Sequence, residues 1–169
     1  TITSNTFKLK ATNTGAVALN IGSYVSSAGA LTLSNATGVS VSVDSTATFN
    51  NSIKADLAST ITVVGGADIG ATISGAAAST ISLDVGSGSF NVGSTALTTF
   101  ALTNSGSVEI SSSSRMSGAT TITVDTQKMA NLSNINTTGL QTLQISGSGT
   151  LAAASIGSHT GQANNLTIS

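Results

Sequence analysis

A short alternating segment, Val41-Ser42-Val43-Asp44, recurs as Ile61-Thr62-Val63-Val64 and again as Ile81-Ser82-Leu83-Asp84, about every twenty residues. Apolar and polar residues alternate within each copy. Period-two alternation with β-branched residues is typical of a β-strand, and self-similarity at a fixed period is typical of a repeat architecture. The same ladder continues along the chain in Phe100-Ala101-Leu102, Ile122-Thr123-Val124-Asp125, Leu143-Gln144-Ile145 and Leu166-Thr167-Ile168.

Two further apolar ladders keep nearly the same period. The first consists of Phe49, Ile69, Phe90, Ile110, Leu132 and Leu151, and the second of Leu33, Ile53 and Ile73. Three ladders with one period predict a parallel β-solenoid of about 20 residues per coil, with equivalent side chains stacked about 4.8 Å apart. The 169 residues provide for roughly eight such coils. A β-sandwich is the alternative, although nothing in a sandwich requires a constant step.

The ladders run through the chain without a change of composition, so we expect one β-solenoid domain over residues 1–169. The sequence starts at Thr1 without a Met or a charged-then-apolar leader. We therefore expect it to be a fragment or a processed part of a longer chain.

The chain carries few charges, with five Lys or Arg, six Asp or Glu and a net charge of −1. Nucleic acids and anionic membranes are bound by clustered basic residues, and the basic residues here are scattered. No apolar run is long enough to cross a bilayer, so we expect neither nucleic-acid binding nor membrane insertion. The absence of Cys excludes disulfides and thiolate metal sites, and it is consistent with secretion from a bacterium.

The sequence offers no catalytic motif. His159 is the only histidine, and no Asp, Glu or Cys lies near it in the sequence. Two Gly-Ser-Gly segments, Gly86-Ser87-Gly88 and Gly147-Ser148-Gly149, are expected to be turns, because no helix signal follows either of them. The six acidic residues fall mostly in different coils, whereas polysaccharide-cleaving solenoids need clustered carboxylates. We expect a protein that is not an enzyme and has no obligatory cofactor.

Calcium is the one ligand for which the sequence supplies candidate residues. Asp84, Asn104 and Asp125 each follow the same strand of successive coils, which predicts a vertical column of oxygen ligands at a corner. Calcium binds six to eight such oxygens. The alternative is that Asp and Asn occupy these positions because their side chains form hydrogen bonds with turn amides.

Ice-binding solenoids display a flat Thr-x-Thr array on one face, and Thr121-Ile122-Thr123 matches that triplet. The outward positions assigned to the main ladder do not form a regular Thr grid. We therefore do not expect ice binding.

In composition and cadence, the whole chain resembles the solenoid regions of bacterial surface-layer proteins of the RTX-secreted type. The resemblance is clearest in residues 58–68, Ala-Ser-Thr-Ile-Thr-Val-Val-Gly-Gly-Ala-Asp, and in residues 137–146, Thr-Thr-Gly-Leu-Gln-Thr-Leu-Gln-Ile-Ser. Residues 65–69, Gly-Gly-Ala-Asp-Ile, resemble half of the calcium-binding nonapeptide of RTX proteins, of which this chain has a single copy.

This resemblance implies a structural protein of the bacterial cell surface that assembles with copies of itself into a surface layer or filament, often with calcium. Autotransporter passengers and adhesins share the cadence. The alternative is therefore an extracellular adhesin rod that binds cell-surface polysaccharide or another surface.

Overall fold

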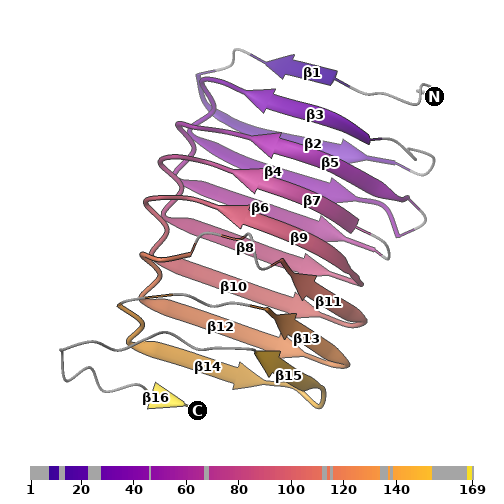
Figure 1. Ribbon diagram of the computed structural model, residues 1–169. Helices are drawn as coiled ribbons and strands as arrows, with labels where there is room; N and C mark the ends of the chain where they lie inside the picture. The colour runs from indigo at the N-terminus through magenta and orange to yellow at the C-terminus, as the bar shows by residue number, and fades with distance from the viewer. Residues whose placement is uncertain are drawn as a thin grey trace.

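The computed structural model describes residues 8–11, 14–22, 28–45, 47–66, 69–111, 114, 116–133, 137, 139–153 and 167–168. These residues form sixteen strands and no helix, and the strands stack in two parallel sheets of eight (Figure 1). Odd-numbered strands make one sheet, here called the odd sheet, and even-numbered strands make the even sheet.

The odd sheet contains β1 (Lys8–Ala11), β3 (Ala28–Leu33), β5 (Phe49–Lys54), β7 (Ile69–Ser74), β9 (Gly88–Gly93), β11 (Ser107–Ile110), β13 (Met129–Leu132) and β15 (Thr150–Ala153). The even sheet contains β2 (Ala16–Ile21), β4 (Gly38–Val43), β6 (Thr60–Gly65), β8 (Thr80–Val85), β10 (Thr99–Asn104), β12 (Thr121–Thr126), β14 (Thr142–Ser146) and β16 (Thr167–Ile168).

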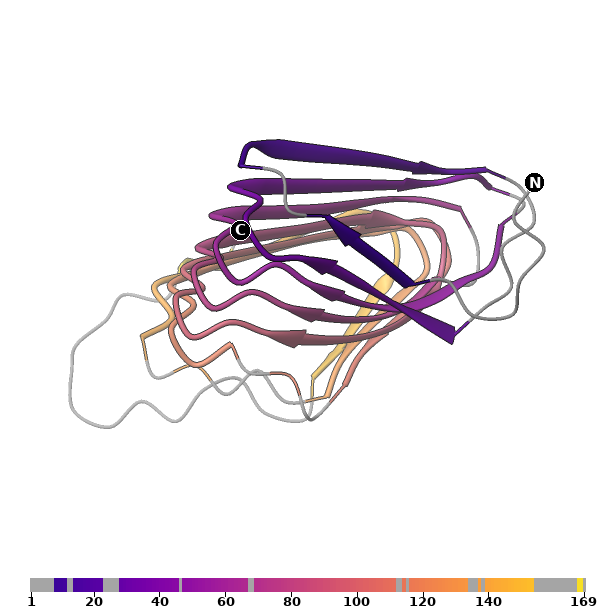
Figure 2. The same cartoon turned by 90° about the horizontal axis from the view of Figure 1, so that it is seen from above.

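Each strand pairs in parallel with its equivalent one turn further along the chain, and successive turns overlie one another around a single elongated interior (Figure 2). This arrangement is a parallel β-solenoid, and the prediction of that fold is confirmed. A sandwich is excluded for the described strands because their ladders are parallel rather than antiparallel.

The period is close to the predicted one, and the number of turns differs slightly. About six turns of about 21 residues make up the solenoid, against the predicted eight coils of about 20. Each sheet has eight strands, of which the two at the ends have one neighbour and the other six have a neighbour on both sides. The step varies from turn to turn: Thr80 follows its partner Thr60 by 20 residues, and Thr121 follows Thr99 by 22.

The register differs from the predicted ladders at several points. Val41 pairs with Val63 rather than with Ile61, so the first copy of the main ladder is displaced by two residues. A shift of two residues preserves the alternation of inward and outward side chains. The apolar pattern therefore fits both registers. The observed register goes with a longer connection in this turn, residues 44–48 between β4 and β5 against residues 66–68 between β6 and β7.

The other two ladders contain the same kind of shift. Phe90 pairs with Ala71 and not with Ile69, which lies opposite Gly88. Ile53 pairs with Leu31 rather than Leu33. In the last turns, Leu132 lies opposite Ala153 and Leu151 opposite Ala130.

The interior consists of apolar columns that run along the solenoid. In the even sheet, two columns of inward side chains are each no more than 4 % exposed. Burying each such side chain contributes about 1.5–3 kcal/mol relative to exposure to water, which makes the columns the main source of stability. Their members are Val39, Ile61, Ile81, Phe100, Ile122 and Leu143 in one, and Val41, Val63, Leu83, Leu102 and Val124 in the other.

One close backbone approach requires glycine. Gly88 begins β9 with φ +150°, and a Cβ at this position would collide with the carbonyl oxygen of Ile69, its partner in the preceding turn. That oxygen belongs to main chain held in the sheet, so it cannot move aside as a flexible side chain would.

We predict that Gly88→Ala lowers the free energy of unfolding by more than about 1 kcal/mol. Gly93→Ala is the matched control in the same strand, because a Cβ there would meet only the carbonyl oxygen of Ile73 at 3.8 Å. The control should stay within about 0.5 kcal/mol of the parent. Urea unfolding followed by circular dichroism measures both, and equal stability of the two variants would contradict the close approach.

Candidate functional site

The residues considered for catalysis do not converge in the described structure. His159 and Asp68 lie outside the described residues. Gly86-Ser87-Gly88 and Gly147-Ser148-Gly149 join β8 to β9 and β14 to β15, as expected for turns. Within the described ranges, no three His, Asp or Glu side chains lie close enough together to hold a metal ion.

The predicted column of calcium ligands is wrong in one member. Asp84 pairs with Thr103, and Thr103 pairs with Asp125. Asn104 is one residue further along and pairs with Val85 and Thr126. Because successive strand residues point to opposite faces, the carboxylates of Asp84 and Asp125 face outward whereas the Asn104 amide faces inward.

Asn104 serves a structural purpose at this corner. It is 1 % exposed, and its Nδ2 donates hydrogen bonds to the carbonyl oxygens of Gly106 and of Met129, the latter at 2.9 Å. These bonds connect the end of β10 to the following turn and to β13 one turn further on. The alternative that Asn bonds the main chain of the turn therefore holds for this residue, although the amide donates to carbonyls rather than accepting from amides.

We predict that Asn104→Ala lowers the free energy of unfolding by about 1–3 kcal/mol, because two carbonyl groups lose their donor. The loss should be the same with calcium and with a chelator, as measured by thermal and urea unfolding. Asn50→Ala changes an exposed Asn of β5 in the same way and should be nearly neutral. A calcium-dependent gain in melting temperature that Asn104→Ala abolishes would contradict the structural assignment.

The outer surface of the even sheet carries a continuous column of threonines. Six successive even strands begin with Thr, and each Thr pairs with the next. A β-branched side chain suits a strand, and outward Thr presents a hydroxyl and a methyl group at each turn. The column consists of Thr60, Thr80, Thr99, Thr121 and Thr142, and Thr167 continues the same register in β16.

The sequence carries a signal for this column. A Thr immediately precedes the first apolar residue of most copies of the main ladder, as in Thr60-Ile61 and Thr121-Ile122. The outward positions predicted from the sequence lie between the apolar residues and do not include this preceding one.

A second line of hydroxyl groups follows the adjoining corner. Ser79 donates from Oγ to the carbonyl oxygen of Ser59 at 3.2 Å, and Thr98 donates from Oγ1 to that of Ser79 at 3.1 Å. Ser59 and Thr120 repeat the pattern with Thr37 and Thr98. Each turn is therefore bonded to the one before it by a side chain as well as by main chain, which holds the edge of the even sheet in a fixed spacing.

The next outward column of the even sheet is less regular. It contains Ser40, Thr62, Ser82, Ala101, Thr123 and Gln144. Ala101 and Gln144 interrupt the hydroxyl groups, so a Thr-x-Thr grid does not form, as the sequence predicts. We refer to these two columns together as the hydroxyl face. Across the described strands β2–β14 of this sheet no Lys or Arg occurs, and Asp84 and Asp125 are the acidic residues.

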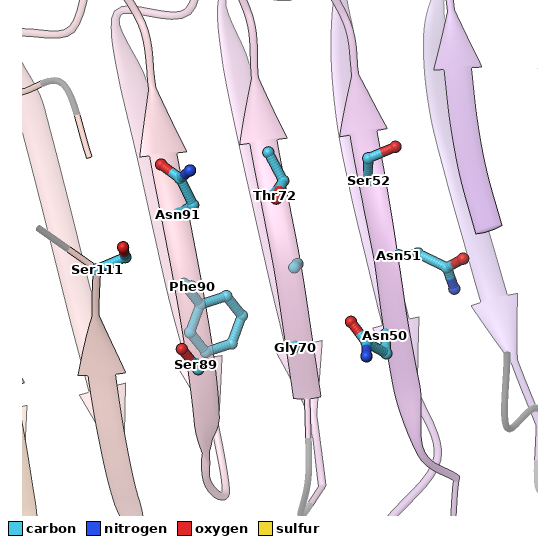
Figure 3. A pocket seen from close by; sticks show the side chains of 10 residues that line it. Asn50, Asn51, Ser52, Gly70, Thr72, Ser89, Phe90, Asn91 and Ser111 are labelled. Carbon is cyan, nitrogen blue, oxygen red and sulfur yellow. The ribbon is translucent and has the colours of Figure 1, made fainter. Parts of the chain in front are cut away.

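The outer surface of the odd sheet contains a polar groove of about 510 Å³. It crosses β5, β7 and β9 and reaches Ser111, the residue after β11, so it follows the solenoid axis over four turns (Figure 3). Gly70 leaves a gap in the middle of the surface, flanked by its strand partners Asn50 and Ser89.

Comparison with protein-family models, curated proteins and solved structures finds no match to this chain. In the part of the chain that the structure describes, there is no helix of the length and apolar character needed to span a membrane.

Proposed function

We propose that this chain is a non-enzymatic structural protein of the bacterial cell exterior, which assembles with copies of itself into a surface layer or filament. The hydroxyl face is the observation that supports this proposal. Its threonine column is regular, both of its columns are uncharged, and a stack of paired strands carries them, so that copies can pack against one another without charge repulsion.

The size of the hydroxyl face favours repeated weak contacts over a stable dimer. The outer surface of β6, β8, β10, β12 and β14, each five or six residues long, covers roughly 20 Å by 24 Å, or about 500 Å². A stable pair of proteins buries about 800 Å² on each partner. A single contact is thus below that size, and association becomes stable only when many contacts act together, as in a sheet or filament.

The composition supports an extracellular location. The chain has no Cys and few charged residues, which is consistent with a secreted bacterial protein whose stability comes from stacked strands rather than from disulfides. Its resemblance to RTX-secreted surface-layer solenoids points to the same location and to calcium as an accompanying ion.

The alternative is an adhesin or autotransporter-passenger rod that binds carbohydrate. The polar groove of the odd sheet favours this second function, because it is a shallow depression along the side of the rod whose lining residues are all uncharged.

Lysines placed in the threonine column should prevent assembly. We predict that the triple variant Thr80→Lys, Thr99→Lys and Thr121→Lys remains folded but no longer forms sheets or filaments, because each contact would bury three charged side chains without partners. Electron microscopy and sedimentation of the purified chain, with millimolar calcium and with a chelator, measure assembly, and circular dichroism measures folding.

The matched control places the same three charges in one column of the odd sheet, as Ser52→Lys, Thr72→Lys and Asn91→Lys. It should assemble like the parent chain. Dispersed parent particles in both conditions would contradict the proposal and favour the adhesin rod. Assembly of the even-sheet variant would show that the hydroxyl face is not the contact.

A further inference from the structure

The groove of the odd sheet is elongated along the solenoid axis. Its lining residues come from the equivalent positions of three neighbouring strands, β5, β7 and β9, and Ser111 extends it towards the next turn. Neighbouring strands lie about 4.8 Å apart, so the groove accepts an extended ligand on the order of 15 Å long. The groove is shallow and open to solvent, so its volume of about 510 Å³ is space above the sheet and leaves one side of a ligand in water.

The residues that line the groove are polar and uncharged, and the nearest charge is the outward carboxylate of Glu109, the strand partner of Ser89 in β11. Asn50 and Asn91 each offer an amide that both donates and accepts hydrogen bonds, and hydroxyl groups surround them. These hydroxyls belong to Ser52, Thr72, Ser89 and Ser111. Such groups match a ligand whose own groups donate and accept, as alcohols do. They offer no ion pair to a phosphate or a carboxylate, and Glu109 at the end of the groove would repel such an anion.

The floor of the groove depends on Gly70. The partners of Gly70 in the neighbouring strands are Asn50 and Ser89, whose side chains face the same outer surface. A Cβ at Gly70 would lie 3.1 Å from Oδ1 of Asn50, so any larger residue would occupy the space between these two side chains. Figure 3 shows this gap in β7 between the polar side chains of β5 and β9.

We propose that this groove binds a neutral oligosaccharide chain lying along the solenoid axis. A sugar chain is extended, uncharged and rich in hydroxyl groups, and it matches both the direction and the chemistry of the lining. This proposal rests on the second function given above, the carbohydrate-binding rod, and adds the charge and the direction of the ligand. The site lies on the sheet opposite the hydroxyl face, so binding can succeed or fail independently of the proposed assembly.

Because its lining exposes no aromatic ring, we expect a single groove to bind a sugar chain weakly. Phe90 is the one aromatic residue of the groove, and it is 1 % exposed, so its ring is not available for stacking against a sugar. Without an aromatic platform, a Kd on the order of 1 mM is expected. Copies aligned in a surface layer would bind a long polysaccharide more tightly through multivalency.

The test measures binding of cellohexaose, chitohexaose and maltohexaose to the monomeric chain by saturation-transfer NMR, with a polygalacturonate oligomer as the anionic control. We expect at least one neutral hexaose to bind at roughly 10 mM or below and the anionic oligomer not to bind. Gly70→Gln should weaken binding about tenfold or more, because its side chain fills the floor of the groove.

Two matched controls separate the groove from general effects of substitution. Gly38→Gln makes the same change at an outward strand position of the even sheet, where a Cβ would meet Ala16 Cβ at an ordinary 3.9 Å. Asn91→Ala removes an amide from the groove, and Asn131→Ala removes one from β13 outside it. Gly38→Gln and Asn131→Ala should bind like the parent.

Three results would overturn the proposal: no binding of any neutral hexaose by the parent chain, equal binding by Gly70→Gln and Gly38→Gln, or equal binding of the anionic oligomer. Urea unfolding of each variant shows whether a loss of binding reflects a loss of folding. If Gly70→Gln does not fold, Asn91→Ala against Asn131→Ala decides the question.

Discussion

Every part of this structure depends on the pairing of each strand with its equivalent one turn further along the chain. The pairing satisfies main-chain hydrogen bonds between turns and at the same time places side chains of one type above one another. Apolar residues then form continuous buried columns, of which Ile61, Ile81 and Phe100 are one segment. The chain needs neither disulfides nor a helix in its described part, because stacking supplies both the core and the rigidity.

The outside of the solenoid is free to differ from sheet to sheet, since outward residues contribute little to the core. The even sheet presents the nearly regular hydroxyl face, whereas the odd sheet is interrupted by Gly70 and carries the groove. The two proposals use these two surfaces. A rod that packs through one face and binds a glycan with the other would anchor an assembled layer to a polysaccharide.

A few polar residues point into the interior, and they are not equivalent. Asn104 bonds two carbonyl groups and holds a corner together. Asn51 is 6 % exposed, and neither atom of its amide has a hydrogen-bond partner. Burial of an unpartnered amide opposes folding by about 1–3 kcal/mol. A contribution to stability therefore does not explain why Asn occupies position 51 of β5.

The sequence by itself determined the fold class, the period and which residues alternate inward, because β-branched residues at every second position, repeated at a constant step, suit a parallel solenoid. It also located the turns at both Gly-Ser-Gly segments. Only the tertiary structure decided the register. Turns of 19 to 22 residues shift strands by one or two positions, and a shift of two leaves the apolar pattern unchanged. The threonine column and the displacement of Asn104 from the acidic column already follow from the main ladder, because Phe100 lies opposite Ile81 and so places Thr103 level with Asp84. The register of the odd sheet does not follow from its ladder, and only the pairing in the structure brings Asn50, Gly70 and Ser89 together in one groove.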